Sequence, residues 1–119
     1  MKKKKVEANY LNYKPCHNKE FPYQLEEDGN ITVLVKNKGI MNRLAQKFLH
    51  KPEVSQIHLD GMGSFIWKLM DGNRTIYDIA VRVDEEFGED AQPLYNRLVT
   101  YIRNLEMYQF IQLQKEEEK

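Results

Sequence analysis

The chain has 119 residues, with 18 basic and 18 acidic side chains that cancel to a formal net charge of zero. This length predicts one domain, and the charge balance gives no general attraction to nucleic acid or to an anionic membrane. A single cysteine excludes an intramolecular disulfide and favours a reducing, cytoplasmic setting, and no apolar run approaches the ~20 residues that span a bilayer.

Residues 1–18 mix Lys, Asn and Tyr without periodicity, so we expect an N-terminal arm that is extended or partly ordered. Cys16 and His17 are adjacent, which raises the possibility of a metal site. No second cysteine exists, however, and the other two histidines lie at no recognised metal-ligand spacing. We therefore interpret this pair as incidental.

Two strands with clear alternation follow the arm. Between them, Asp28-Gly29 forms a strong hairpin signal because both positions tolerate positive φ. The residues that share a face are Phe21, Tyr23 and Leu25 in the first strand, and Ile31, Val33 and Val35 in the second.

The pattern changes to a helical period over residues 39–50, and Lys51-Pro52 ends it. Basic residues recur from Lys36 to Lys51 without an acid, which is typical of the solvated face of an amphipathic helix. A docking surface for an acidic partner is the sharper alternative.

Residues 55–59 then predict a third strand, with Ile57 and Leu59 inward and Gln56 and His58 outward. We interpret His58 as a half-exposed strand residue and not as a ligand or base. The sequence places no carboxylate or nucleophile beside it.

Two helical patterns follow this strand. The first begins at Asp60 as N-cap and ends at Asp71-Gly72, which tolerates the left-handed conformation. The second opens at Thr75, with Asp78 three residues later as a capping box, and ends at Gly88.

A third helical pattern can start from Asp90, with Pro93 tolerated in the first turn. Its apolar arc spans about 160°, which is wider than the ~100° that packing of a surface helix needs. Leu94, Leu98, Tyr101 and Leu105 surround the core direction, Tyr95, Val99 and Ile102 extend the arc, and Arg103 borders it. A short strand near Ile111 and a charged tail follow.

These elements predict an α+β fold that is winged-helix-like: a three-stranded antiparallel sheet followed by a three-helix bundle, with an extra helix inserted between strands two and three. We expect an arm at 1–18, the domain at 19–113 and a tail at 114–119. The sequence contains no nucleophile and base pair, metal motif or phosphate loop. We therefore expect no enzyme activity, catalytic residue, metal or cofactor.

The stretch IHLDGMGSFIWKLMDGNRTIYDIA resembles the PqqD family, which comprises coenzyme PQQ synthesis protein D and related recognition elements for ribosomally made precursor peptides. The resemblance covers roughly residues 19–113. The chain departs from the usual pattern in its long arm and in the helix at residues 39–50. The matching features are Leu59-Asp60, Ile66-Trp67, Leu69-Met70-Asp71-Gly72, Thr75 and Ile79-Ala80.

The resemblance implies a peptide-binding module and not an enzyme. Members of the family hold the leader of a precursor peptide and present its core to a modifying enzyme, often a radical S-adenosylmethionine enzyme. The leader adds as a strand to the edge of the third strand and packs against the third helix. The corresponding candidates in this chain are Ser55, Gln56, Ile57, His58, Leu59, Tyr95, Val99, Ile102 and Arg103.

Several alternatives stay open. The arm or the inserted helix could cover the flank of the third helix, and two copies could pair through the edge strand as a homodimer. A winged-helix nucleic-acid binder would use Asn96, Arg97, Arg103 and Asn104, although two arginines in a neutral protein give it thin support. A hydrolase or metal enzyme ranks last because it lacks any motif.

Overall fold

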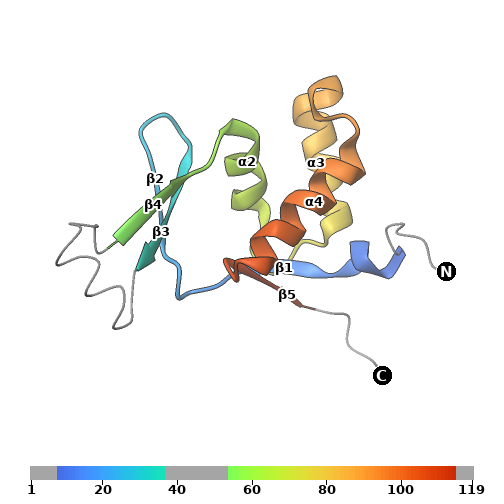
Figure 1. Ribbon diagram of the computed structural model, residues 1–119. Coiled ribbons are helices and arrows are strands. Elements are labelled where there is room, and N and C mark those ends of the chain that lie inside the picture. The colour runs from blue at the N-terminus through green and yellow to red at the C-terminus, as the bar shows by residue number, and fades with distance from the viewer. Residues whose placement is uncertain (1–7, 37–53, 115–119) are drawn as a thin grey trace. The chain divides into compact units, whose positions relative to one another are not determined.

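The structure is a computed structural model that describes residues 8–36 and 54–114. Two compact units divide the chain, one of residues 19–64 and one of residues 1–18 together with 65–119. Figure 1 labels the strands and α-helices. The elements in chain order are η1 (Ala8–Asn12), β1 (Lys14–His17), β2 (Tyr23–Leu25), β3 (Ile31–Lys36), β4 (Val54–His58), α2 (Gly61–Leu69), α3 (Ile76–Phe87), η2 (Gly88–Ala91), α4 (Leu94–Met107) and β5 (Ile111–Gln114).

The unit of residues 19–64 contains a three-stranded antiparallel sheet in the order β2-β3-β4. The predicted hairpin turn is confirmed: Gly29 has φ of 88°, and the N–H of Asn30 donates to the Asp28 carboxylate at 2.9 Å. Ile31 and Val33 of the central strand are buried, as alternation predicts, but Thr32 between them is buried as well. Ile57 of β4, which the sequence predicted to point inward, is 37% exposed. The two strands thus form for local reasons that are visible in the sequence.

Ser64 joins the beginning of α2 to this sheet. Its hydroxyl accepts a hydrogen bond from the N–H of Ile31 at 2.8 Å and donates to the carbonyl of Leu59 at 3.3 Å. The predicted N-cap is also confirmed, because the Asp60 carboxylate accepts from the N–H of Gly63 at 2.7 Å. These bonds fix where the strand ends and the helix begins.

The unit of residues 1–18 and 65–119 contains most of the helical residues, and we call it the helical unit. Its core consists of fully buried side chains from the helices, the turns after them and β5. The capping box predicted at Thr75 and Asp78 is present, with both reciprocal bonds at 3.0 Å. Gly88 is the C-cap residue of α3 with φ of 56°, and Gly72, in the turn after α2, has φ of 84°. The largest fully buried side chains of this unit are Trp67, Met70, Ile76, Ile79, Ile102 and Ile111.

The N-terminal arm is more ordered than its sequence indicates. Its strand β1 pairs antiparallel with β5, with Cys16 opposite Gln112, and the two strands lie side by side in Figure 1. The N–H of Gly72 also donates to the carbonyl of Pro15 at 2.9 Å. Periodicity could not reveal this strand, because its pairing partner lies almost the whole chain away.

The last helix begins later than predicted. Residues from Gly88 to Ala91 form the 3₁₀ helix η2, and α4 starts at Leu94 with Pro93 as its N-cap residue. The expected helix at residues 39–50 lies outside the described residues.

The described residues therefore show an α+β chain with antiparallel sheets and three α-helices, and the winged-helix arrangement stays a prediction. None of the helices in the described ranges has the length and apolar character to cross a bilayer.

Candidate functional site

The strand β4 forms an edge of its sheet in the described part of the chain. It pairs with β3 from Lys36 opposite Val54 to Thr32 opposite His58, and no described strand lies on its other side. An edge strand presents unpaired N–H and C=O groups, to which an extended segment can add. Among the described residues β4 is thus an edge strand, and its use as a peptide site stays a prediction.

The register decides which residues present these groups. The N–H of Leu59 donates to the carbonyl of Ile31 at 2.9 Å, so the alternate residue Ile57 also directs its backbone toward β3. Leu34, opposite Gln56, donates instead to Pro22 on the far side of β3 at 2.8 Å. The outward backbone groups therefore belong to Gln56 and His58.

The His58 side chain has a structural partner. Its Nδ1 lies 2.9 Å from the hydroxyl oxygen of Thr32, which is completely buried. Hydrogen bonds from Thr32 and from Gln24 hold the pKa of the Glu26 carboxyl below its usual value. Because the Thr32 hydroxyl donates to Glu26, it accepts from an Nδ1–H of His58. This network joins the three strands through their side chains.

The residues predicted on α4 differ in exposure. Val99 and Ile102 are only 4% and 0% exposed, so both belong to the core of the helical unit. Tyr95 is 40% exposed and can reach a ligand. The wide apolar arc of α4 is thus largely filled by the protein itself.

The arm reaches α4 at Arg103. The guanidinium of Arg103 lies over the ring of Tyr10, with its carbon 4.9 Å from the ring centre, which is a cation–π contact. Tyr10 is buried, and this burial raises the pKa of its phenol. One of the alternatives from the sequence, an arm that covers part of α4, therefore has a direct contact in its favour.

Sequence reasoning missed a cavity of about 480 Å³ beside Tyr95, which we call the α4 hollow. The Gln92 amide links its two sides: it lies 3.5 Å from the Asp84 carboxylate, and its oxygen accepts from the N–H of Leu94 at 3.2 Å. The space lies where α4 begins, with Pro93 as the N-cap residue of the helix. The lining residues are Asp84, Gln92, Pro93, Leu94, Tyr95 and Asn96.

β4 and α4 belong to different units of the chain. Each supplies one half of the predicted peptide site, the backbone edge at Ser55 to Leu59 and the side chains at Tyr95, Val99, Ile102 and Arg103. Their combination into a single site stays a prediction.

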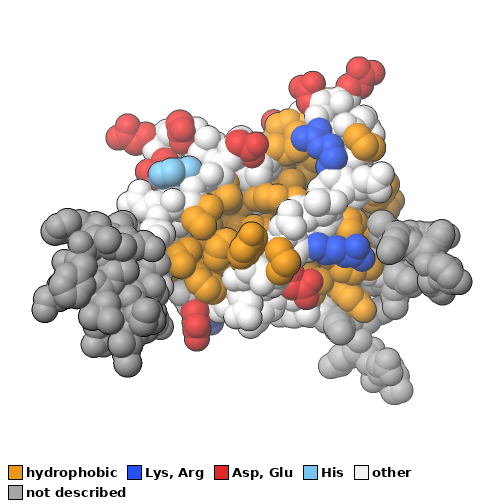
Figure 2. Space-filling view, in the orientation of Figure 1, with side chains coloured by type: hydrophobic (Ala, Val, Ile, Leu, Met, Phe, Trp, Pro, Cys, Tyr) orange, Lys and Arg blue, Asp and Glu red, His pale blue; other side chains and the backbone are white. Residues whose placement is uncertain are grey.

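The arginines proposed for nucleic acid already contact the protein. Nη1 of Arg97 donates to the carbonyl of Asp90 at 2.7 Å, and Arg103 covers Tyr10. Figure 2 shows basic side chains that stand apart over the region of α3 and α4, with hydrophobic ones between them. The described side chains on this face form no continuous basic patch, which is the usual footprint of phosphate binding.

No metal centre emerges over residues 8–36 and 54–114, which contain no cluster of three or more potential ligands. Cys16 and His17 are consecutive in β1, so their side chains point to opposite faces. Nε2 of His17 instead donates to the carbonyl of Trp67 at 2.8 Å.

Comparison with known proteins gives one family. The model of the family described as coenzyme PQQ synthesis protein D (PqqD) matches residues 40–111. The match includes β4, the three α-helices of the described residues and the first residue of β5, and it begins after the β2–β3 hairpin. No curated protein and no solved structure matches the chain significantly.

Proposed function

Because the chain belongs to the PqqD family, we propose that it is a non-catalytic module that captures the leader of a ribosomally made precursor peptide. In this proposal it presents the peptide to a modifying enzyme, with a radical S-adenosylmethionine enzyme as the first candidate. The family is described by its part in coenzyme PQQ synthesis, which accords with such an accessory role.

The observation that carries the proposal is the outer edge of β4. Gln56 and His58 direct their N–H and C=O groups away from β3, and no strand of the described residues pairs with them on that side. A leader in extended conformation would pair with these two residues and lengthen the sheet by one strand. Recognition of this kind uses the backbone, so the identity of the Gln56 side chain matters little.

Side-chain selectivity would come from α4. Tyr95 is exposed enough to contact an apolar leader residue, and the α4 hollow beside it can take a side chain. Val99 and Ile102 are buried, so in this proposal they help to shape the surface of α4 but do not make the main contacts with the leader. Arg103 is held by Tyr10 and borders the surface.

The test is an amide NMR titration with a synthetic peptide that carries the leader sequence of a candidate precursor. We expect shifts at residues 55–59 and around Tyr95. Gln56→Pro should abolish binding because it removes an outward N–H, whereas Gln56→Ala should have little effect. Tyr95→Ala should weaken binding by about 1 to 2 kcal/mol, roughly 5- to 30-fold in Kd.

A matched control is available on the opposite edge of the same sheet. Leu25→Pro in β2 removes an N–H that faces away from β3, as the Gln24–Thr32 and Leu34–Pro22 pairing indicates, and it should bind the leader normally. Shifts confined to the arm, or equal binding by the Gln56→Pro protein, would place the site elsewhere.

A second copy of the chain is the competing occupant of this edge. Sedimentation of the free protein at increasing concentration separates the two cases. A dimer that the Gln56→Pro substitution dissociates, and that the leader does not displace, would favour self-association over leader capture.

A further inference from the structure

The two-stranded sheet β1-β5 of the helical unit also has an edge strand, β5. β5 pairs with β1 on one side, and no strand of the described residues pairs with it on the other. This edge belongs to the helical unit, whereas β4 belongs to the unit of residues 19–64. Any ligand of β5 therefore concerns a different surface from the proposed leader site.

The register again identifies the exposed backbone groups. The N–H of Asn18 donates to the carbonyl of Phe110 at 2.9 Å, while the carbonyl of Pro15 accepts from Gly72 on the side away from β5. Hydrogen-bonded pairs thus fall at Cys16–Gln112 and its alternate neighbours. Leu113, opposite Pro15, must direct its N–H and C=O away from β1, and Ile111 does the same.

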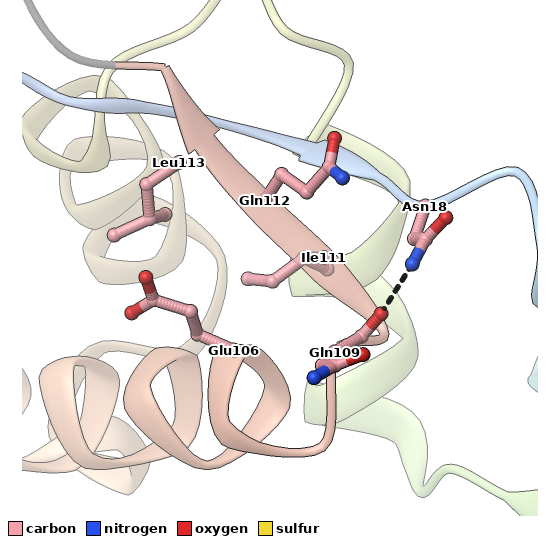
Figure 3. A pocket seen from close by; sticks show the side chains of 6 residues that line it. All are labelled: Asn18, Glu106, Gln109, Ile111, Gln112 and Leu113. Carbon is pink, nitrogen blue, oxygen red and sulfur yellow. Dashed lines mark hydrogen bonds between the residues drawn. The ribbon is translucent and has the colours of Figure 1, made fainter.

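A cavity of about 330 Å³, which we call the β5 hollow, runs along these residues. Figure 3 shows the side chains of Glu106 and Leu113 pointing from α4 and β5 into the same space. Gln109, with φ of 67°, makes the reversal that brings β5 back beside the end of α4, and its carbonyl accepts from the Asn18 amide at 2.8 Å. The lining residues are Asn18, Glu106, Gln109, Ile111, Gln112 and Leu113.

The charge of the β5 hollow is negative. Glu106 is its one ionised side chain, and it forms no ion pair with any described residue. It lies in the last turn of α4, a turn without a basic residue, where the helix dipole adds negative potential. The remaining polar groups are carboxamides. A cationic side chain would be stabilised there by both the carboxylate and the helix end.

The two residues that follow Glu106 in the sequence are of the kind enriched at protein interfaces. Met107 and Tyr108 are 65% and 62% exposed, which is high for large hydrophobic side chains. They follow Glu106 directly, at the same end of α4. Apolar area, a free strand edge and an unpaired carboxylate thus occur together.

We propose that β5 is a second docking edge, which binds an extended segment of a partner protein that carries a lysine or arginine side chain. The segment pairs with the backbone of Ile111 and Leu113, and its basic side chain enters the β5 hollow toward Glu106. Met107 and Tyr108 supply apolar contact at the rim. The inference goes beyond leader capture, since it adds a surface for a second protein.

The experiment uses two blocked pentapeptides, Thr-Val-Lys-Val-Thr and Thr-Val-Glu-Val-Thr, added at millimolar concentration to the isotope-labelled chain. We expect the lysine peptide to shift the amides of Ile111 and Leu113 and to bind at least about threefold more tightly than the glutamate peptide. Glu106→Gln should remove this preference. Glu86→Gln, the same change at an exposed position of α3, should preserve it.

Two substitutions at Leu113 distinguish the contribution of its backbone N–H from that of its side chain. Leu113→Pro should abolish binding, because it removes the outward N–H without breaking a bond to β1, whereas Leu113→Ala should retain it. The proposal is overturned by silent β5 amides or by equal binding of the two peptides. Concentration-dependent β5 shifts without peptide would also overturn it, since they would make a second copy the occupant. Leader binding at β4 is measured on other amides, so the two proposals fail separately.

Discussion

His17 connects β1 to the helical core through a single ring. The ring stacks on Trp67 with centres 4.2 Å apart and planes 13° apart, and Nε2 donates to the carbonyl of the same residue. Burial lowers the pKa of His17 below its ordinary 6.5, although the hydrogen bond to Trp67 opposes this effect. The imidazole is thus held neutral against a buried partner.

This arrangement makes stability depend on pH. As pH falls below about 6.5, the unfolded chain takes up a proton at His17 before the folded chain does, so the free energy of unfolding decreases. The loss should not exceed about 1.4 kcal/mol per pH unit from one group. It should level off once the pH falls below the lowered pKa of the folded state.

Chemical denaturation of the His17→Phe protein between pH 5 and 7.5 checks this. Phenylalanine preserves the stacking but not the hydrogen bond, so we expect a loss of about 1 kcal/mol at pH 7.5. The difference between the two proteins should shrink as pH falls. A parallel pair of curves would show that His17 does not titrate differently on folding.

At the scale of elements, strand register determines how strongly a proline substitution in β4 destabilises the sheet. Ile57 directs its N–H into the sheet and Gln56 directs its own outward, although the two are neighbours in one strand. A proline at Ile57 leaves a carbonyl of β3 without its donor, whereas a proline at Gln56 removes a bond only to solvent.

We therefore expect Ile57→Pro to destabilise the fold by about 2 kcal/mol or more, and Gln56→Pro by less than about 1 kcal/mol. Urea denaturation of the two variants measures both values. Ile57→Ala serves as the control for the lost side chain. Equal destabilisation by the two prolines would mean that the register is shifted by one residue.

For the whole molecule, charge argues against nucleic acid as the main partner. The formal net charge is zero, and the two arginines of α4 contact Asp90 and Tyr10. Phosphate contacts that require Arg97 or Arg103 would first have to break these interactions. Electrostatic affinity for a duplex should therefore be low.

We expect non-specific duplex DNA to bind no more tightly than ~10⁻⁶ to 10⁻⁴ M at physiological salt, with affinity that falls as salt increases. Fluorescence anisotropy with a labelled duplex measures this. A sequence-specific, submicromolar complex that is lost in Arg97→Ala or Arg103→Ala would favour a winged-helix DNA-binding protein over a peptide-binding module.

The sequence by itself determined the elements whose signals are local. Asp28-Gly29, Asp60 and Thr75 act within a few residues of their own position, so the turn and both helix starts could be read directly. The family was identified from a contiguous block as well. The start of α4 was predicted too early, at Asp90 instead of Leu94. An acidic residue a few positions before a proline is compatible with both a 3₁₀ helix and the first turn of an α-helix.

Only the tertiary structure decided which surfaces are free. The sequence could not show that β1 pairs with β5, since a strand of four residues carries no periodicity and its partner is distant. Nor could it show that Val99 and Ile102 are buried while Tyr95 is exposed, because all three lie on one apolar arc of α4. Outward backbone groups at Gln56 and Leu113 depend on register, which long-range hydrogen bonds fix and side-chain pattern does not.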